Sequence, residues 1–475
     1  MDYCPNFEIL FQPVLTNRNN MELTTEDFVK FITSYENADT ASLLLSRNKW
    51  KNIDIDLAVN TICTRKKLKS KVPSWYAVPE LVYPSKLSGE QCSSEETAFL
   101  KASIAEKFLK EIHSYDTYER PGVEKCGFRI ADLTGGMGVD SFAFSKIAEK
   151  VLYNEMNPSL AEASRRNFRI LKADNIQVTC RMIIPSETYS QNGTNHTDAS
   201  GTGETSLQYT ESFNGQPVSP AALLCTFKPD LIFLDPARRN SEGKKVFLIE
   251  DCSPDVLTMK DELLSISRFI MIKLSPMADI DMVLERLGRK CRELYITASG
   301  GECKELIILM DREWDGECTI NAGGLIFLRS EEKSSQAILP ENQEKVKSAK
   351  FLFEPGKALM KSGAFNLICS RLHLTKLAKS THLYISEHIS EKDECRKYGK
   401  VFRIIDTAHL DKTSIRTAGK LHPKAEVTAR NIPMTSEMLR KKLNVSSGSN
   451  THIFGAGVEY ERKKESFLFI TEKQS

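Results

Sequence analysis

The sequence lacks the features that mark zinc modules, membrane spans and exported chains. Its 12 cysteines share no repeating spacing and never stand as C-x-x-C, which argues against a zinc module and against a small disulfide scaffold. No apolar run reaches the roughly 20 residues that cross a bilayer. The start, MDYCPNFEIL, carries acids and a proline where a signal peptide needs basic and then apolar residues. We therefore expect a cytoplasmic protein with free thiols and no bound metal.

The chain also lacks a strong net charge. Its 65 lysines and arginines and 63 aspartates and glutamates leave a net charge of +2. Binding to a polyanion would therefore have to come from local basic patches. Hydrophobic residues at 41% and charged residues at 27% are ordinary for a globular protein. The length of 475 residues suggests two to four domains, at about 100–200 residues per domain.

Residues 1–115 are expected to form a helical N-terminal region. Residues 24–27, TTED, resemble a capping box ahead of FVKFI. Residues 55–71, IDLAVNTICTRKKLKSK, have apolar residues at helical spacing and a basic end. Basic residues in a last helical turn complement the helix dipole. The alternative is that this basic end contacts RNA.

Residues 116–330 are expected to form a doubly wound α/β domain. Short apolar runs alternate there with amphipathic segments, which predicts a parallel sheet with helices on both faces. The runs are FRIADL, KVLYNE, IQVTCRMI, DLIFLD, FIMIKLS, LYITA and ELIILM. Only SGGECK separates the last two, so they should form a terminal antiparallel hairpin. A Rossmann-like sheet with such a hairpin is typical of class I methyltransferases, whereas a dinucleotide-binding fold is parallel throughout.

Two polar stretches divide the remaining chain. Residues 186–228 are dense in Ser, Thr, Asn and Gly, which predicts a disordered surface insertion, with a substrate-covering lid as the alternative. Residues 330–348, SEEKSSQAILPENQEKVKS, indicate a linker. Beyond it, residues 345–475 contain strand-like runs such as THLYISE and helix-like runs such as TSEMLRKKL. We expect these to form a small α+β domain.

The segment ADLTGGMGVD carries the candidate cofactor site. It follows the strand FRI, and its glycines allow a tight turn whose following helix presents backbone amides to a ligand. Asp132 precedes the glycines, where a carboxylate would repel a pyrophosphate but could pair with the ammonium group of an amino-acid moiety. Glu155 ends the next strand, where a carboxylate can take both ribose hydroxyls. Together these features favour a methyl donor over NAD.

The segment PDLIFLDPARRN carries the candidate reaction site. Asp235, Pro236 and Ala237 follow an apolar strand, at the edge where ligands meet in doubly wound sheets. A carboxylate and backbone carbonyls there can accept hydrogen bonds from an amino group and align its lone pair with a methyl group. Arg238 and Arg239 could hold a phosphate; the alternative is a strand-ending turn with solvated arginines. Further strand-end candidates are Lys273, Ser275, Pro276, Glu250 and Asp251.

Together the motifs resemble a bacterial family of class I methyltransferases with a THUMP-like C-terminal domain. The motifs are ADLTGGMGVDSF, YNEMNP, DLIFLDPARRN, LIEDCSPD, IKLSPMADI and GGECKELI. The resemblance extends upstream through EQCSSEETAFLKA and downstream through FLFEPGKALMKSGAFN, HLYISE and VTARNIPMTSEMLRKKL, so it covers most of the chain.

This resemblance implies S-adenosyl-L-methionine as the cofactor and assigns roles to individual residues. The candidate cofactor-binding residues are Asp132, Thr134, Gly136, Gly138, Asp140, Glu155, Ser94 and Thr97, with Ser93 beside the last two. The candidate methyl-transfer residues are Asp235, Pro236, Ala237 and Arg238. THUMP-like domains in RNA-modifying enzymes present RNA to the catalytic domain, so the resemblance also implies an RNA acceptor, such as a base nitrogen of tRNA or rRNA. Basic residues compatible with phosphate contacts are Arg430, Arg440, Lys441 and Lys442.

Two segments of the chain depart from related patterns. The acid that often follows the third strand and pairs with the adenine amino group is not evident in IQVTCRMIIP, where Glu187 could substitute. The cysteine that 5-methyluridine methyltransferases carry after the fifth strand is absent from IKLSPM, which disfavours methylation of carbon. Two alternatives stay open: methyl transfer to a small molecule or protein, and a non-catalytic module that binds RNA or assists assembly.

Overall fold

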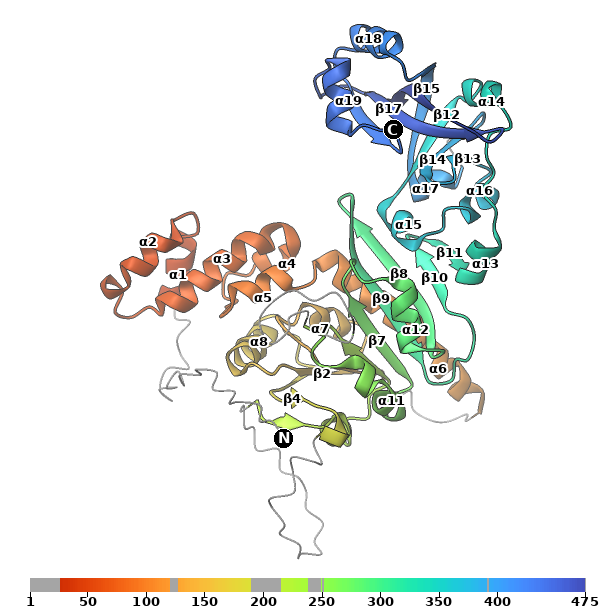
Figure 1. Cartoon of the computed structure of the whole chain (residues 1–475). Coiled ribbons are helices and arrows are strands. Elements are labelled where there is room, and N and C mark those ends of the chain that lie inside the picture. Colours follow the sequence, from red (N-terminus) through yellow and green to blue (C-terminus); the bar gives the residue numbers. More distant parts are fainter. Residues whose placement is uncertain are drawn as a thin grey trace, which may run out of the picture. The chain divides into compact units, whose positions relative to one another are not determined.

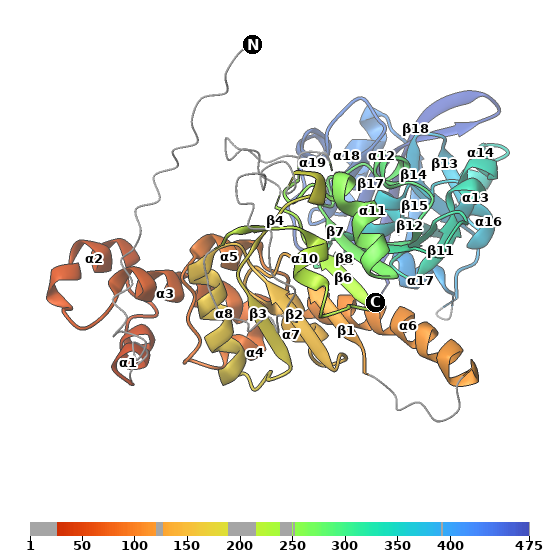
Figure 2. The ribbon, with the colours of Figure 1, turned by 90° about the horizontal axis from the view of Figure 1, so that it is seen from below.

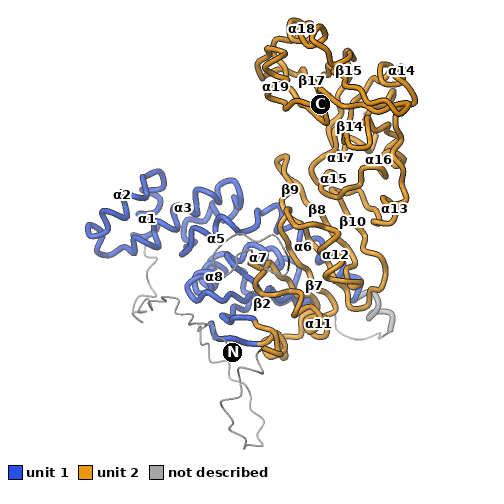
Figure 3. The backbone as a smooth tube through the Cα atoms, in the orientation of Figure 1, with its two compact units in different colours: residues 1–183, 196–218 blue, residues 184–195, 219–475 orange. Residues whose placement is uncertain are grey.

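The computed structural model describes residues 26–119, 127–188, 215–237, 249, 252–390 and 393–474. The chain divides into two compact units (Figure 3). Unit 1 comprises Met1–Ile183 and His196–Val218, and unit 2 comprises Ile184–Asn195 and Ser219–Ser475. Among the described helices, none is long and apolar enough to cross a membrane.

Unit 1 begins with the predicted helical region (Figure 1). Its elements are α1 (Glu26–Ser34), α2 (Thr40–Leu45), the 3-10 helix Arg47–Lys49, α3 (Ile55–Lys71), α4 (Pro73–Tyr76), α5 (Lys86–Gln91) and α6 (Glu95–Glu119). The Asp54 carboxylate caps α3 by accepting a hydrogen bond from the Leu57 N–H at 2.9 Å. Phe28, Ile32 and Ile62 lie in the buried core that the first helices share. The helical N-terminal region is therefore confirmed.

The basic end of α3 serves the packing of unit 1. Arg65 is 7% exposed and donates hydrogen bonds to the carbonyl oxygens of Val78 and Tyr76, at 3.2 and 3.0 Å. Lys67 pairs with Glu90 at 2.7 Å. These contacts favour the structural interpretation of this helix end over an RNA-binding one.

Three parallel strands of unit 1 alternate with helices, as the sequence predicts. The strands are β1 (Arg129–Asp132), β2 (Lys150–Asn154) and β3 (Ile176–Thr179), in the spatial order β1-β2-β3, and the helices between them are α7 (Val139–Phe144) and α8 (Pro158–Ile170). Asp132 is the register partner of Tyr153, so β1 and β2 end at the same edge. This edge carries the two acids that the sequence singles out.

The run IQVTCRMI was expected to form one strand but forms two. After β3, the Arg181 N–H donates to Asn154 Oδ1 at 3.0 Å, which takes the chain out of the sheet. It then forms β4 (Met182–Ile183), which pairs in parallel with β5 (Pro217–Val218). Helix α10 (Pro220–Leu224) follows, capped by Ser219. Residues 186–188 are also helical. The ends of the expected 186–228 insertion are therefore regular, and residues 189–214 lie outside the described part.

Unit 2 contains six strands of a mixed sheet. They are β6 (Leu231–Leu234), β7 (Phe269–Leu274), β8 (Cys291–Ser299), β9 (Glu302–Asp311), β10 (Thr319–Ala322) and β11 (Leu325–Leu328), in the order β11-β10-β8-β9-β7-β6. Strands β6 and β7 are parallel, and β8 and β9 form the predicted antiparallel hairpin. The sheet continues past this hairpin, because β10 pairs in parallel with β8. Helices α11 (Val256–Ile266) and α12 (Ile280–Leu287) contact each other beside these strands (Figure 2).

The expected linker and C-terminal domain also lie in unit 2. The linker stretch contains α13 (Arg329–Ser334) and α14 (Gln343–Lys347). The strands beyond it form a seven-stranded sheet in the order β13-β14-β12-β15-β18-β17-β16. These strands are β12 (Phe351–Pro355), β13 (Thr375–Ala378), β14 (Thr381–Ser386), β15 (Gly399–His409), β16 (Glu426–Arg430), β17 (Thr451–Tyr460) and β18 (Lys463–Lys473). The helices are α15 (Lys357–Ser362), α16 (Leu367–Arg371), α17 (Cys395–Tyr398), α18 (Lys412–Leu421) and α19 (Ser436–Leu443). The prediction of a small α+β domain is therefore confirmed.

Candidate functional site

The edge of unit 1 at the end of β1 holds a fixed, buried carboxylate. Asp132 is 1% exposed. Its Oδ2 accepts a hydrogen bond from Ser141 Oγ at 2.6 Å, and its Oδ1 accepts one from the Thr134 N–H at 3.0 Å. These two donors are uncharged and fix the orientation of the carboxylate. A carboxylate at the end of this strand is suited to accept hydrogen bonds from an ammonium group.

Each of the three glycines after β1 is required for a different structural reason. A Cβ at Gly135 would lie 2.2 Å from the Tyr153 ring, and a Cβ at Gly138 would lie 2.4 Å from the Phe168 ring. Gly136 differs, because within the described part of unit 1 its Cβ would meet only the Thr134 carbonyl oxygen, at 3.9 Å. Gly136 and Gly138 also have φ values of +53° and +85°, which favour glycine. Gly135 and Gly138 thus serve packing, while the space beside the Gly136 Cα is open to a ligand.

Glu155 lies one residue beyond β2 and is held by backbone amides. Its Oε2 accepts a hydrogen bond from the Gly136 N–H at 3.0 Å, and its Oε1 accepts one from the Asn157 N–H at 2.8 Å. Burial raises the pKa of Glu155, although these amides oppose the shift. The carboxylate therefore connects the glycine loop to the end of β2 and is held in one orientation. A carboxylate fixed in this way is suited to accept hydrogen bonds from two adjacent hydroxyls of a ligand.

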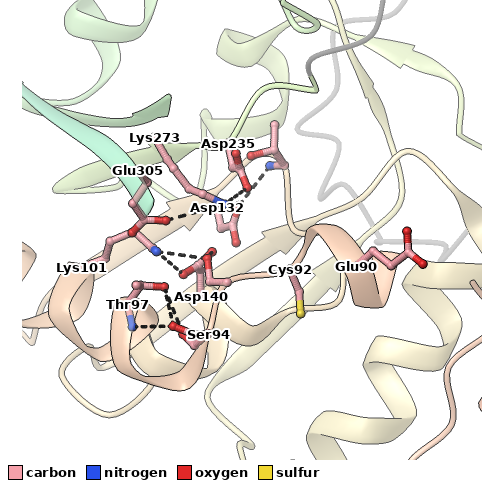
Figure 4. A network of polar contacts seen from close by, with 12 residues as sticks. Glu90, Cys92, Ser94, Thr97, Lys101, Asp132, Asp140, Asp235, Lys273 and Glu305 are labelled. Atoms are coloured by element: carbon pink, nitrogen blue, oxygen red, sulfur yellow. Dashed lines mark hydrogen bonds and ion pairs between the residues drawn. The ribbon is translucent and has the colours of Figure 1, made fainter. Parts of the chain in front are cut away.

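A buried ion pair fixes the helix that follows the glycine loop (Figure 4). Asp140 lies in the first turn of α7, and its Oδ1 is 3.0 Å from Lys101 Nζ of α6. Ser93 Oγ donates to Asp140 Oδ2 at 2.7 Å, and Lys101 Nζ donates to Ser93 Oγ at 3.1 Å. Lys101 is fully buried. The predicted cofactor residue Asp140 therefore anchors α7 to α6.

Ser94 and Thr97 have a local role in this structure. The Thr97 N–H donates to Ser94 Oγ at 3.2 Å, and the Ala98 N–H donates to the Ser94 carbonyl oxygen at 2.9 Å. These are the contacts of a helix N-cap, and they start α6. Ser94 and Thr97 thereby place Ser93 and Lys101, which make the contacts to Asp140. A direct role of Ser94 and Thr97 in cofactor binding stays a prediction.

Unit 2 places a second group of charged side chains at its strand ends (Figure 4). Asp235 directly follows β6, and its Oδ2 accepts a hydrogen bond from Lys273 Nζ of β7 at 2.6 Å. Glu305 of β9 lies 4.0 Å from the same Nζ. Lys273 and Glu305 are 7% and 4% exposed, whereas the Asp235 side chain is 29% exposed. The lysine thus lies between two carboxylates, of which only Asp235 reaches solvent to an appreciable extent.

The other residues of the predicted reaction site differ in placement. Pro236 is buried, and exposed Ala237 exchanges two backbone hydrogen bonds with Ser253, at 2.7 and 3.0 Å. Ser275 is buried and accepts a hydrogen bond from the Met277 N–H at 3.2 Å. The candidates Arg238, Arg239, Glu250 and Asp251 lie outside the described residues.

The end of β3 offers no acid for an adenine amino group. Cys180 follows β3, is 4% exposed, and its Sγ lies 3.8 Å from the Met156 carbonyl oxygen. Burial raises the pKa of this thiol, so it stays protonated. Glu187, the proposed substitute, is exposed in unit 2.

Sequence reasoning missed Lys101 and Glu305. Lys101 is four residues after Thr97 and eight after Ser93. This spacing is that of one helix face, so the sequence could have indicated that Lys101 lies on the same side as these two residues. Glu305 is a single acid at the start of the apolar run LIILM. A charge in a buried strand needs a partner, which was the available signal.

Comparisons with known proteins agree with this architecture. Family models match a ferredoxin-like domain at residues 351–392 and a THUMP domain-like region at residues 399–473. A crystal structure from Porphyromonas gingivalis W83, named a candidate methyltransferase, matches at 26% identity and a TM-score of 0.69. The match covers 94% of this chain and 98% of that one. A comparison of the sequence with curated proteins gives no match.

Two further solved structures match over a smaller part of the chain. An rRNA methylase from Streptococcus thermophilus matches at 10% identity and a TM-score of 0.24, covering 39% of this chain and 87% of that one. A candidate methyltransferase from Streptococcus mutans, in complex with SAH, matches at 12% identity and a TM-score of 0.24, covering 39% and 88%. These two similarities are too weak to inform on this chain. The first match shows a methyltransferase-like fold, and the family models show a THUMP-like C-terminal domain.

Proposed function

We propose that this protein is an S-adenosylmethionine-dependent methyltransferase whose acceptor is a base nitrogen of tRNA or rRNA. The observation that carries the proposal is the geometry at the ends of β1 and β2. There buried Asp132 accepts hydrogen bonds from Ser141 Oγ and the Thr134 N–H, and Glu155 accepts one from the N–H of Gly136, whose Cα borders open space. A cofactor with one ammonium group and one ribose fits these two carboxylates.

The donor-binding roles follow from the chemistry of the two carboxylates. Asp132 would hold the ammonium group of the methionine moiety by charge-assisted hydrogen bonds. Glu155 would accept hydrogen bonds from the two ribose hydroxyls, as acids at the end of a second strand do in Rossmann-like folds. When bound, S-adenosylmethionine supplies an activated methyl group on sulfur. The remaining requirement for the protein is therefore to orient the acceptor.

We assign that orienting role to Asp235. Its carboxylate would accept a hydrogen bond from the N–H of the acceptor and take up the proton that the nitrogen loses when its bond to the methyl group forms. Lys273 would hold Asp235 in one rotamer through the 2.6 Å contact. Lys273 is therefore a positioning residue, and Glu305 balances its second side.

RNA as the acceptor is supported by the THUMP domain-like region at residues 399–473, by analogy to RNA-modifying enzymes. The four basic residues named from the sequence are not equivalent. Arg430 pairs with Glu354 at 3.1 Å, and Arg440 lies 3.6 Å from Glu426. Lys441 and Lys442 are exposed, which makes them better suited to contact phosphates.

Calorimetry with the full chain tests the donor half of the proposal. We expect micromolar binding of S-adenosylmethionine, no binding of NAD, and loss of donor binding in Asp132→Asn. The control is Asp174→Asn, which removes an exposed carboxylate from the same unit and should bind the donor normally. Unchanged donor affinity in Asp132→Asn would refute the pocket assignment.

Transfer of a radiolabelled methyl group tests the acceptor half. Total tRNA and rRNA, a protein extract and a small-molecule extract would each be incubated with the enzyme and labelled donor. We expect label in RNA, and less of it with Asp235→Ala, which should still bind the donor. Label confined to protein or to small molecules would refute the RNA acceptor and leave the donor assignment intact.

A further inference from the structure

The positive charge of this nearly neutral chain is concentrated in its last strands and helices. Residues 399–474 contain 14 lysines and arginines against eight aspartates and glutamates, a net charge of +6. The rest of the chain therefore carries −4, since the whole carries +2. A local excess of this kind is how a nearly neutral protein can attract a polyanion.

One side of α18 carries a regular row of this charge. Lys412, Arg416 and Lys420 follow one another at intervals of four residues and are all exposed. Residues four apart lie on the same face of a helix, about 6 Å apart along its axis. Helix α18 contains no acidic residue. The three side chains therefore form a line of unneutralised positive charge within that helix.

The end of α19 lies against the end of α18 (Figures 1 and 2). A Cβ at Gly419 would lie 1.9 Å from the Leu443 carbonyl oxygen, so only glycine allows this approach. Lys424 and Ser446 form a bridge that joins the two segments beyond the helices. The last turn of α19, which carries exposed Lys441 and Lys442, therefore lies close to the last turn of α18, which carries exposed Lys420.

The basic surface of α18 and α19 is defined by these exposed side chains. Its members are Lys412, Arg416, Lys420, Lys424, Lys441 and Lys442. Unlike Arg430 and Arg440, they have no ion-pair partner within the described part of unit 2.

Helix stability explains only part of this surface. Basic residues in a last turn complement the negative end of the helix dipole, which accounts for Lys420, Lys441 and Lys442. Lys412 is the first residue of α18, where the dipole disfavours a positive charge. A row that runs from the unfavourable to the favourable end of α18 indicates a ligand that spans the helix.

We propose that this basic surface docks the phosphodiester backbone of the RNA acceptor. The proposal rests on the proposed function for the identity of that RNA. A nucleic-acid strand offers one negative charge per nucleotide at regular intervals, which suits a regular row of cations. Lysine is depleted at protein–protein interfaces, and five of the six residues are lysines, so the composition disfavours a protein partner.

Salt-dependent RNA binding by the full chain tests this surface. The probe is a fluorescein-labelled RNA hairpin of mixed sequence, titrated between about 50 and 200 mM salt. Lys412→Gln, Arg416→Gln and Lys420→Gln are combined in one variant. The control variant combines Arg462→Gln, Lys463→Gln and Lys464→Gln, which removes the same charge from the turn after β17 and the first two residues of β18. Thermal melting establishes that both variants are folded.

We expect the α18 variant to bind the hairpin more weakly and with a smaller salt dependence. Each lost phosphate contact lowers the slope of log K against log salt by about 0.7–0.9, so three contacts lower it by about 2–3. The control variant should keep most of the slope. Calorimetric binding of S-adenosylmethionine should be unchanged in both variants, because neither touches Asp132 or Glu155.

Other outcomes separate this proposal from the proposed function. If the α18 variant binds like the unchanged chain, the surface assignment is overturned while an RNA acceptor stands. If the unchanged chain does not bind RNA but binds the donor, both the surface and the RNA acceptor are overturned. Equal competition by polyglutamate or by anionic phospholipid vesicles would overturn the phosphodiester assignment in favour of those partners.

Discussion

Lys101 is a charge that the fold has removed from water and must compensate. It is fully buried and contacts Asp140 at 3.0 Å and Ser93 at 3.1 Å. Taking a charge out of water is costly, and losing one partner of such a pair leaves the other buried and unpaired. The pair therefore ties the start of α7, which follows the glycine loop, to α6.

Replacing only one partner of this pair should be worse than replacing both. We expect Lys101→Met to lower the free energy of unfolding by about 3–5 kcal/mol, measured by urea denaturation. The double variant Lys101→Met with Asp140→Leu should recover a large part of this loss. Additive effects of the two substitutions would contradict a coupled pair.

Glu155 should make donor binding depend on pH in one direction. Burial raises its pKa above the ordinary glutamate value, so its carboxyl is protonated at a higher pH than usual. Protonation turns one carboxylate oxygen into a donor and removes the negative charge, which weakens hydrogen bonds accepted from hydroxyls. Donor affinity should therefore fall as the pH drops through this raised pKa and level off above it. Calorimetry across the pH range measures the effect, and Glu155→Gln should lack this component.

Lys273 should affect turnover without affecting the donor. Removing its contact to Asp235 in Lys273→Met should lower methyl transfer by about a hundredfold, the scale expected for a reacting group misplaced by about 1 Å. The donor dissociation constant should stay unchanged. Lys273→Arg, which keeps the charge and the hydrogen bond, should restore part of the rate. Equal rates for the Met and Arg variants would show that Lys273 does not position Asp235.

The sequence could predict the position of residues at strand ends, whereas their functional roles stay predictions. Asp132, Glu155 and Asp235 follow apolar runs, and such runs end where a sheet presents ligands. Their contacts were not predictable in the same way. Lys101 meets Asp140 because α6 packs against α7, and this packing leaves no local pattern in the sequence.

At the level of elements, the turn from β1 to α7 depends on Gly138. Its φ of +85° disfavours other residues, and a Cβ there would lie 2.4 Å from the Phe168 ring of α8. Gly138→Ala should therefore lower the free energy of unfolding by more than the roughly 1–3 kcal/mol expected from backbone strain alone. It should also weaken donor binding.

Gly363 separates these two effects for Gly138→Ala. It has nearly the same backbone conformation, φ +76° and ψ 11° against +85° and 12°, but its Cβ position lies near only the end of the flexible Arg329 side chain, at 3.2 Å, within the described part of unit 2. Gly363→Ala should lower the melting temperature mainly through backbone strain and leave donor binding intact. A loss of stability equal to that of Gly138→Ala would show that contact with Phe168 is unimportant.

Strands with a strong apolar pattern of their own were predicted. Strands that form only by pairing with neighbouring strands were not. The β8–β9 hairpin follows from two long apolar runs around Gly300 and Gly301, both with positive φ. Strands β10 and β11 have only four residues each and become strands by pairing with β8 and with each other. The split of IQVTCRMI depends on the Asn154 side chain of another strand. Short strands and interruptions of this kind are properties of the sheet rather than of their own sequence.

At the scale of the whole molecule, the methyltransferase-like fold and the C-terminal α+β domain were predictable. They follow from the alternation of strands and helices and from the resemblance, and the P. gingivalis structure supports them over 94% of the chain. The domain boundaries at 116–330 and 345–475 stay predictions. The separation of charge is not visible in the overall composition, because a net charge of +2 is the sum of a positive C-terminal region and a negative remainder.

Donor binding should also be visible in the unfolding of the whole chain. A ligand that binds only the folded state stabilises it by about 2.7 kcal/mol when its free concentration is a hundred times its dissociation constant. S-adenosylmethionine at that ratio should therefore raise the temperature of the calorimetric transition that includes unit 1, where Asp132 and Glu155 lie. NAD at the same concentration should leave the transition unchanged, and Asp132→Asn should not respond to the donor. An equal shift with NAD would mean that the carboxylates at the ends of β1 and β2 do not discriminate between the two cofactors, and the donor assignment would fail.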